Sequence, residues 1–482
     1  MKKLRCVKPT IKELNTFYQE KMGNTIPKNK EYICKEPNQF RPVAEYEEMG
    51  GVIFSYIGTK EPKDKHKQLP PRGERTFGVP NELIVLTQQN DSEKPVHTFI
   101  FCDDEKQLEP INASLQKTAD EMGVKFNPDH VHLIPWDTDT YWTRDFAPWW
   151  LYNEATEEYG IAKHIYTSLG GGTVGLVEGS ENAALDGGTG IFRGNDDYGA
   201  VKLADFLNAP IRQWNNAKWH GQPNKEIIPE NKWFFTGMLH VGGNYMCTTD
   251  GRIASSYLAA TQNELPSDEY YDGNITVKSI DMRMKYIMEQ SNRFLGAQRY
   301  YALVDPTGTY IGHIDCWGKF LSDNLLLLAE SNDKTINKGL DEISNFLTKC
   351  YENDGMGSTL TVKRVNCPDI YVPNGGAECA TTAPYTNSLI LNNCVYVPIA
   401  DKKYENANRA ALEVYKEAYP KNYKIYGIRG KKETPWLGTD ALHCRTNAIP
   451  RKVVDRWLKS QELNIDKMEE PVIRPHEKET NI

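Results

Sequence analysis

Three short stretches of the sequence combine residue types that could carry out hydrolytic chemistry. The first is His313-Ile314-Asp315, in which an imidazole stands two residues before a carboxylate. If this stretch is a strand, residues i and i+2 project to the same side, so His313 and Asp315 would form an acid–base group beside a carboxylate. In an isolated His-x-Asp, the histidine more often lies in the core with its hydrogen bonds made to nearby groups. A further alternative is that the two residues are two of the ligands of a metal ion.

The second stretch places Arg144 and Asp145 among aromatic side chains. Five aromatic residues lie between positions 141 and 150. Two charges buried there would be desolvated together, so a structural Arg144–Asp145 ion pair is one interpretation. The aromatic setting favours a cation site, in which Trp142 flanks an alkyl-guanidinium stem and Asp145 binds its charged head.

The third stretch carries a cysteine between two basic residues. His443 and Arg445 flank Cys444, and cationic neighbours could lower the pKa of its thiol from about 8.5. Nine other cysteines are present, so this local signal is weak by itself. Unlike Cys350 in an amphipathic run or Cys394 in a strand, however, Cys444 lies in a turn-rich segment.

Composition excludes several classes of protein. The 482 residues carry a net charge of -8, with basic and acidic residues scattered along the chain. No basic stripe predicts a nucleic acid partner, and no apolar run reaches the roughly 20 residues of a membrane span. The polar N-terminus shows no signal peptide, which predicts a cytoplasmic protein as given and leaves other secretion routes open.

The ten cysteines include no Cys-x-x-Cys pair, which argues against a zinc ribbon or a disulfide scaffold, and we predict no metal and no cofactor.

Strand-like and helical patterns alternate along the chain, which predicts an α/β fold. Extended runs are expected at Gly51 to Ile57, Leu83 to Thr87 and His97 to Phe101. Helical spacing is found from Leu108 to Met122, from Leu340 to Cys350 and from Tyr404 to Ala418. Asn392-Asn393 predicts a two-residue hairpin turn, because asparagine tolerates positive φ. The repeated unit is therefore strand, strand, helix, strand, and periodicity alone fits a three-layer sandwich equally well.

Polar segments mark the limits of the predicted fold. Residues 1–40 are predicted to be a polar N-terminal extension, and 41–456 the catalytic domain. An insert at about 208–233 and the Gly-rich run Gly170 to Gly190 are predicted surface decorations. One more helix, around Val453 to Leu463, is expected after Ile449, and 457–482 is predicted to be a charged tail.

The three stretches together resemble the agmatine deiminase-related, bacterial-type peptidylarginine deiminases of the pentein (guanidine-modifying) superfamily. The resemblance covers about residues 41 to 450, and its segments agree in order and approximate spacing. They are Trp-x-Arg-Asp-Phe at 142–146, Gly-Gly-Asn-Tyr-Met at 242–246, His-Ile-Asp-Cys-Trp-Gly-Lys-Phe at 313–320, Pro-Tyr-Thr-Asn-Ser-Leu-Ile-Leu-Asn-Asn at 384–393, and Thr-Pro-Trp-Leu-Gly-Thr-Asp-Ala-Leu-His-Cys-Arg-Thr at 434–446.

The resemblance implies a five-bladed α/β propeller around a central, negatively charged tunnel. It also implies roles for single residues. Its catalytic positions fall on Asp145, His313, Asp315 and Cys444, and its substrate-channel positions fall on Trp142, Tyr310 and Asn387.

Two positions depart from the family pattern. Relatives specialised for a C-terminal arginine carry two pocket arginines before an Asn-Asp-Asp run, whereas Ile191 to Asp197 keeps one, Arg193, with an apolar residue in place of the other. Gly312 stands where the closest relatives have an acidic residue.

These residue types suit hydrolysis of a guanidinium group. The cation carries five donors in a planar fork, so it favours opposed carboxylates such as Asp145 and Asp315. Cys444 would attack the central carbon and His313 would protonate the departing ammonia. The predicted function is deimination of arginine to citrulline, with a peptide C-terminal arginine as substrate and a Cys444 thiouronium intermediate. Agmatine or free arginine is the alternative substrate, and amidino transfer to an amine a less favoured reaction.

Other classes of protein could use parts of the same residue set. A cysteine protease could use Cys444, His313 and Asp315, but it has no need for a second carboxylate beside Trp142. A metallohydrolase could recruit His240 with His313 and Asp315. A propeller that binds arginine without catalysis is disfavoured because all four catalytic positions are intact.

Overall fold

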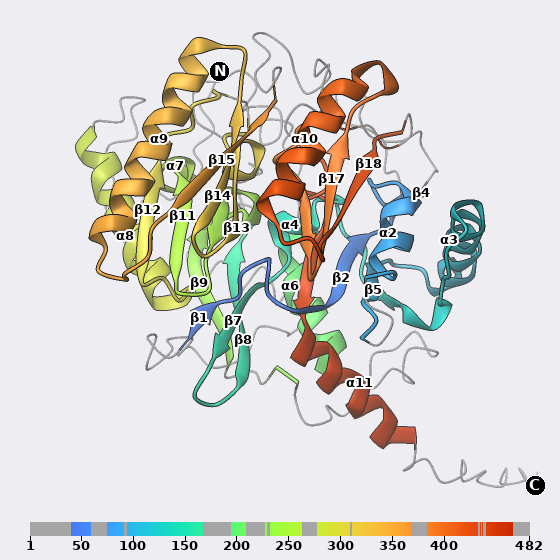
Figure 1. The fold of residues 1–482 in the computed structure, drawn as a ribbon. Coiled ribbons are helices and arrows are strands. Elements are labelled where there is room, and N and C mark those ends of the chain that lie inside the picture. The colour runs from blue at the N-terminus through green and yellow to red at the C-terminus, as the bar shows by residue number, and fades with distance from the viewer. Residues whose placement is uncertain are drawn as a thin grey trace, which may run out of the picture.

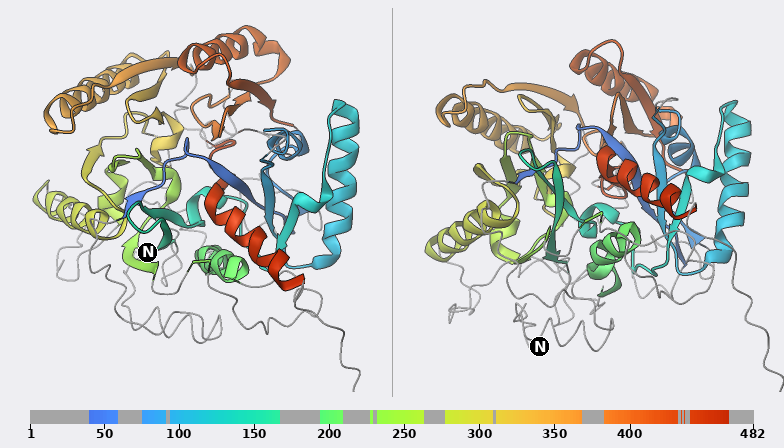
Figure 2. Two further views of the ribbon diagram at one scale, coloured as in Figure 1. Left: turned by 60° about the horizontal axis from the view of Figure 1, so that its bottom comes forward. Right: turned by 90° about the horizontal axis from the view of Figure 1, so that it is seen from below.

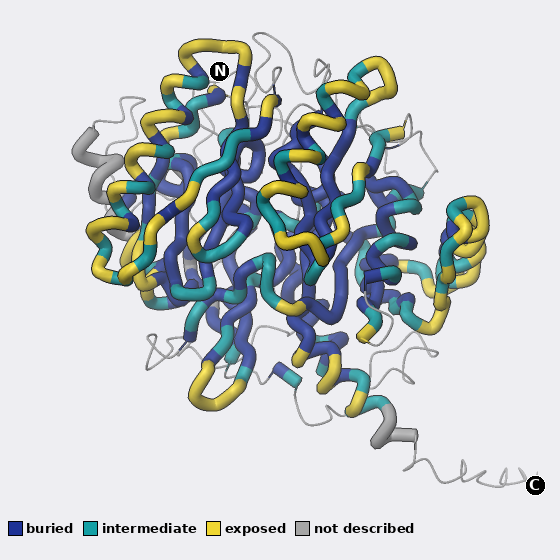
Figure 3. The backbone as a smooth tube through the Cα atoms, viewed as in Figure 1, coloured by how far each residue is buried: buried dark blue, intermediate teal, exposed yellow. Residues whose placement is uncertain are grey.

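The computed structural model describes residues 40–58, 75–90, 94–166, 194–208, 227–228, 232–262, 277–308, 311–367, 383–431, 434, 436 and 440–465. Within these ranges the chain is a mixed α/β structure with five sheets of three or four strands and one two-stranded ribbon (Figure 1). Figure 2 shows most of the helices at the periphery, outside the sheets. The sheet strands are largely buried, and the helices expose one face (Figure 3).

Three consecutive sheets repeat one local order. In each of them an antiparallel strand pair is followed by a helical segment and a third strand that lies parallel to the second. The strands are β10 (Tyr245–Cys247), β11 (Arg252–Ser256), β12 (Arg299–Leu303), β13 (Gly318–Ser322), β14 (Leu325–Glu330), β15 (Thr361–Asn366), β16 (Leu389–Leu391), β17 (Cys394–Ile399) and β18 (Lys424–Arg429). The connecting helices are α7 (Leu258–Gln262), α8 (Val277–Phe294), α9 (Lys334–Asn353) and α10 (Glu405–Ala418).

The other two large sheets extend the same order. One has the order β1 (Arg41–Pro42), β7 (Trp149–Asn153), β8 (Glu158–Ile165), β9 (Trp233–Leu239), with α6 (Gly194–Asn208) between its parallel strands. The other has the order β19 (Asn447–Pro450), β2 (Met49–Ser55), β5 (His97–Phe101), β6 (Val131–Ile134), with α2 (Asn81–Thr87) and α3 (Leu108–Met122). Because β19 pairs antiparallel with β2, this sheet joins the end of the folded chain to its beginning.

Several elements match the sequence patterns closely. Helix α3 ends at Gly123, which adopts φ +67 as a left-handed C-cap. The predicted hairpin joins β16 to β17, and Asn392 in its turn has φ +54. The Asn392 side chain also accepts from the Met49 amide at 2.7 Å and donates to the Met49 carbonyl at 3.0 Å, so the turn fixes this hairpin against β2.

The strand predicted at Leu83 to Thr87 is wrong, because these residues form most of helix α2. Glu82 lies in the first turn, where a negative charge favours a helix start. Leu83, Ile84 and Val85 are all buried. A short run of consecutive buried apolar residues shows no helical period, so its sequence cannot be told from that of a buried strand.

The C-terminal helix belongs to the packed structure. Helix α11 (Arg451–Ile465) runs past the boundary predicted at 456, and Trp457 is 0% exposed. Its ring contacts Phe99, His132 and Phe206. The packed part of the chain therefore extends at least to Trp457.

Some predicted segments lie outside the described residues. These are the extension apart from Phe40, the run Gly170 to Gly190 and most of the insert 208–233. In the described ranges, no helix is both long enough and apolar enough to cross a membrane. The seven cysteines in those ranges are free thiols.

Candidate active site

The site is built from loops that each precede an antiparallel strand pair. Short helical turns shape three of these loops, and the other two are irregular. They are α4 (Thr143–Phe146) before β7, η6 (Gly242–Asn244) before β10, η7 (Ile314–Cys316) before β13, the loop of Asn387 before β16, and the loop of Cys444 before β19. Because the sheets repeat one order, loops that are far apart in the sequence occupy equivalent places, and their side chains meet.

Gly243 marks the point where three of the predicted catalytic side chains meet. A β-carbon at this position would lie 2.9 Å from Asp145 Oδ1, 2.9 Å from His313 Nδ1 and 3.1 Å from Asp315 Oδ2. The Gly243 amide also donates to Asp145 Oδ1 at 3.1 Å. The neighbouring Gly242 is needed for a different reason, since a β-carbon there would collide with the Arg144 carbonyl oxygen.

The Cys444 sulfur lies at the same place. Its thiol donates to Asp315 Oδ2 at 3.3 Å, and Asn387 Nδ2 donates to the sulfur at 3.1 Å. Asn387 Oδ1 accepts from the backbone amides of Ala441 and Cys444 at 3.0 and 3.2 Å. Asn387 therefore holds the cysteine loop and contacts the sulfur directly.

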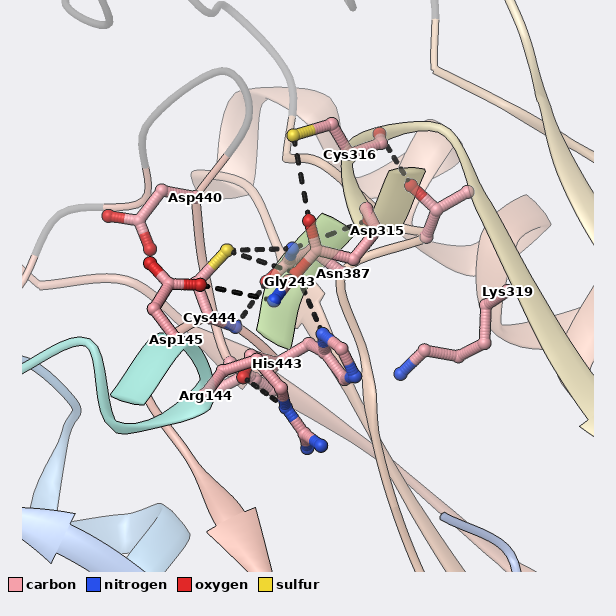
Figure 4. A network of polar contacts seen from close by, with 12 residues as sticks. Arg144, Asp145, Gly243, Asp315, Cys316, Lys319, Asn387, Asp440, His443 and Cys444 are labelled. Atoms are coloured by element: carbon pink, nitrogen blue, oxygen red, sulfur yellow. Dashed lines mark hydrogen bonds and ion pairs between the residues drawn. The ribbon is translucent and has the colours of Figure 1, made fainter. Parts of the chain in front are cut away.

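Carboxylates surround the Cys444 thiol. Figure 4 shows Asp145 and Asp440 on one side of the sulfur and Asp315 on the other. Burial, followed by the negative charges of Asp315 and Asp440, raises the pKa of the Cys444 thiol well above its usual value. The free site therefore holds a neutral thiol beside a cluster of negative charge.

The prediction that His443 and Arg445 lower the pKa of Cys444 is wrong, because both side chains turn to carboxylates. His443 Nδ1 donates to Asp315 Oδ2 at 2.7 Å. Arg445 donates from Nε and Nη2 to Asp440 at 3.0 and 2.7 Å. Neighbours in sequence alternate in direction along a turn, so adjacency to Cys444 did not mean contact with its sulfur.

His313 and Asp315 project into one site, although the strand predicted for them is absent. His313 is extended and caps the 3-10 turn η7, which contains Asp315. Ile314 packs into the core of the sheet that follows. Burial lowers the pKa of His313 to about 4, so the imidazole is neutral near pH 7. Neither of its ring nitrogens has a hydrogen-bond partner among the described residues, which leaves both available to a substrate.

Arg144 and Asp145 do not form the ion pair that was the alternative for this stretch. Arg144 Nη2 lies 3.8 Å from Glu45 Oε1, and its Nε donates to the His443 carbonyl at 3.2 Å. Asp145 turns to Gly243 instead. The indole of Trp142 donates to Asp440 Oδ2 at 3.0 Å, which fixes the aromatic ring beside the third carboxylate.

Sequence reasoning missed Gly243, Asp440 and Glu45 as members of the site. The first two lie inside motifs that were recognised, at 242–246 and 434–446. Glu45 follows β1 with no motif around it, and only its contacts in the fold reveal it. Two predicted substrate residues, Arg193 and Tyr310, lie outside the described residues.

A cavity of about 80 Å³ lies next to this site. Its lining includes Asp315 and His443, but neither Cys444 nor His313. His240 lines it too, stacked on Tyr245 with ring centroids 3.8 Å apart. No group of three or more His, Cys, Asp or Glu in the described ranges is arranged to hold a metal ion.

Comparisons with known proteins agree with this geometry. The family model of the Porphyromonas-type peptidyl-arginine deiminases matches residues 280–450, which contain His313, Asp315, Asn387 and Cys444. Over these residues the chain is similar to the Porphyromonas-type peptidyl-arginine deiminases. It is a guanidino-group deiminase, a hydrolase that acts on amidines.

Relatives of this deiminase cover most of its length. "Putative agmatine deiminase 1" of Listeria monocytogenes serotype 4b is 20% identical over 344 residues, which are 67% of this chain and 79% of that protein. The agmatine deiminase of Enterococcus faecalis has the same fold, with a TM-score of 0.56 and 16% identity over 86% of this deiminase and 97% of that chain. An agmatine deiminase from C. jejuni with substrate bound gives a TM-score of 0.50 and 15% identity over 85% of this deiminase and 96% of that chain.

Proposed function

We propose that this deiminase converts the guanidinium of a peptide C-terminal arginine to citrulline and ammonia, with Cys444 as the nucleophile. One observation carries the chemistry: polar atoms of Asp145, His313 and Asp315 converge within about 3 Å of the position that a β-carbon of Gly243 would take, and the Cys444 sulfur lies 3.3 Å from Asp315. A guanidinium between the two aspartates would donate to both of them and present its central carbon to the sulfur.

The raised pKa of Cys444 suits a cationic substrate. In the free enzyme the negative charges of Asp315, Asp440 and Asp145 oppose ionisation of the thiol. A bound guanidinium offsets these charges, so ionisation becomes easier only when substrate is present. Neutral His313 can then accept the thiol proton, because its lowered pKa keeps its ring unprotonated near pH 7.

The proposed reaction proceeds in two balanced halves. The Cys444 thiolate adds to the guanidinium carbon, the carbon–nitrogen bond breaks, and ammonia leaves with the proton held by His313. His313 then deprotonates a water molecule that adds to the thiouronium carbon. The carbon–sulfur bond breaks, which releases the ureido product and returns the thiol.

Two substrates have specific support. The matching family model is that of peptidyl-arginine deiminases, and Arg193 keeps one of the two arginines expected for binding a carboxylate. Agmatine is the second candidate, because agmatine deiminases are among the relatives in both sequence and fold. Agmatine has no carboxylate, so a cation at the pocket mouth would favour the peptide.

A comparison of four substrates tests this function. We expect ammonia release to be fastest with a peptide ending in arginine, and slower with its amidated form, free arginine and agmatine. Cys444→Ala should abolish ammonia release while leaving the circular dichroism spectrum unchanged. Arg193→Ala should raise KM for the free-acid peptide and leave that for the amidated peptide unchanged. Equal rates on the two peptides would remove carboxylate recognition, and ornithine without ammonia would show amidino transfer instead.

We infer further that the five large sheets are the blades of a pentein propeller around this site. The repeated strand order and the closing pair β19–β2 support this arrangement. The origin of the site residues in loops before the antiparallel strand pairs supports it as well.

A further inference from the structure

His443 stands between two carboxylates and contacts no sulfur. Its Nδ1 lies 2.7 Å from Asp315 Oδ2, and its Nε2 lies 3.2 Å from Glu45 Oε2. A carboxylate can only accept, so both contacts are hydrogen bonds only if each ring nitrogen carries a proton. The ring is then cationic and has no nitrogen left to accept a proton from Cys444.

The backbone of His443 is held as firmly as its ring. Its amide donates to the Asn387 carbonyl at 3.1 Å, and its own carbonyl accepts from Arg144 Nε at 3.2 Å. The side chain is 6% exposed. The imidazole therefore has little freedom to turn away from Asp315 (Figure 4).

Glu45 completes the arrangement from the opposite side. Its Oε2 lies 3.1 Å from Lys319 Nζ, and its Oε1 accepts from the Ile390 amide at 3.0 Å and lies 3.8 Å from Arg144 Nη2. Burial opposes ionisation of Glu45, but Lys319, His443 and Arg144 outweigh it and lower its pKa well below the usual value. Positive and negative side chains thus alternate up to the proposed guanidinium site, in the order Lys319, Glu45, His443, Asp315.

We propose that His443, anchored by Glu45, is a positioning residue for deimination: it orients the Asp315 carboxylate toward the substrate and keeps it ionised. The proposal rests on the proposed function, because Asp315 matters here only as a ligand of the guanidinium. Burial alone would favour protonated Asp315, yet the hydrogen bond and charge of His443 lower the pKa of this carboxyl. If Asp315 were protonated, only one of the two proposed ion pairs with the guanidinium, that of Asp145, would remain.

The groups that face Asp315 come from four parts of the fold. Titratable or charged neighbours are His313 and Cys316 on its own turn, Asp145 of α4, His443 and Cys444 on the loop before β19, and Lys319 of β13. Among these, His443 makes the shortest hydrogen bond to the carboxylate, at 2.7 Å. Removing it should therefore have the largest effect on the protonation of Asp315.

The test is the pH profile of kcat/KM for wild type, Glu45→Gln and His443→Gln. Each change should move the acid limb to higher pH by about one to two units, because it weakens or removes a hydrogen bond that favours the ionised form of Asp315. The double variant should shift the limb no further than His443→Gln, since both changes act through the same ring.

Glu47→Gln is the matched control. Glu47 lies in the same turn as Glu45 but binds Arg41, with two hydrogen bonds of 2.8 Å. Glu47→Gln should lower stability and leave the acid limb in place. If Glu45→Gln behaved like Glu47→Gln, the role of Glu45 would be structural and the proposal would fail.

Other outcomes separate this proposal from the proposed function. A shift of the alkaline limb alone would make His443 a base for Cys444 and overturn the positioning role. An active wild type with unmoved acid limbs in both variants would overturn this inference and leave the function intact. A wild type inactive on every guanidino substrate would overturn both.

Selective 15N-histidine NMR gives a readout without turnover. The signals lost in His443→Gln should be those of a ring protonated on both nitrogens, and a neutral tautomer would contradict the proposal.

Discussion

Gly243 shows at the scale of a residue how closely the site residues approach one another. A methyl group there would lie within about 3 Å of Asp145, His313 and Asp315, so the missing side chain lets these three groups converge. All of these contacts are with side-chain atoms rather than with backbone. A larger residue would therefore obstruct the site before it disturbed the fold.

We predict that Gly243→Ala lowers kcat/KM by on the order of 100-fold, because the added methyl would push the side chains of Asp145, His313 and Asp315 out of position. Its urea midpoint should stay near that of wild type. Gly123→Ala is the control, since Gly123 has φ +67 with open space around it, and strain there should cost about 1 kcal/mol without loss of activity. Wild-type activity in Gly243→Ala would place the substrate elsewhere.

The sequence contained enough information to predict which residues gather at the site but not their contacts. His313, Asp315 and Cys444 stand in motifs with specific neighbours, so their chemistry could be predicted. Whether His443 faces the sulfur or a carboxylate depends on the backbone path of a turn. A turn has no regular period from which the direction of a side chain could be predicted. Glu45 is separated from Lys319 by most of the chain, so only the folded structure brings the pair together.

At the scale of elements, the periodic helices and the Asn392 hairpin could be predicted because each has a polar face or a turn signal. Helix α2 could not, since its buried run of branched residues resembles a strand. Helix α11 was expected, but its burial was not, because Trp457 precedes a charged stretch of sequence. Its contacts with β5 and β6 depend on the closure of the chain through β19.

We predict that Trp457→Ala destabilises the protein by about 3–5 kcal/mol, because it leaves a cavity between α11 and the rings of Phe99 and His132. Urea unfolding measures the effect, and activity per folded molecule should stay unchanged. Lys459→Ala, at an exposed position of the same helix, should change stability by less than about 0.5 kcal/mol. Equal effects of the two substitutions would show that α11 does not pack as described.

For the whole molecule, buried histidines make stability depend on pH. Burial lowers the pKa of His97 to about 4, of His132 to about 3 and of His164 to about 4, from an ordinary value of 6.5. The native state keeps these rings neutral, whereas the unfolded chain protonates them below about pH 6.5. Their contribution to stability is thus fully present above pH 6.5 and is lost as the pH falls toward 4.

We predict a fall in the free energy of unfolding between pH 6.5 and 4.5, of about 1.4 kcal/mol per pH unit for each of these histidines. Urea midpoints at pH 7, 6 and 5 measure it. His132→Phe should reduce the slope, because a phenyl ring cannot take up a proton in the unfolded chain. Identical midpoints at pH 7 and pH 5 would contradict the assignment of neutral, buried rings.

The covalent intermediate offers the most direct measurement of the central claim. Wild-type enzyme mixed with a peptide ending in arginine is quenched in acid during turnover, digested and analysed by mass spectrometry. We expect the fragment containing Cys444 to gain the mass of the substrate less one ammonia, and no other cysteine to do so. An adduct on a different cysteine, or citrulline formed at the wild-type rate by Cys444→Ala, would contradict the central claim.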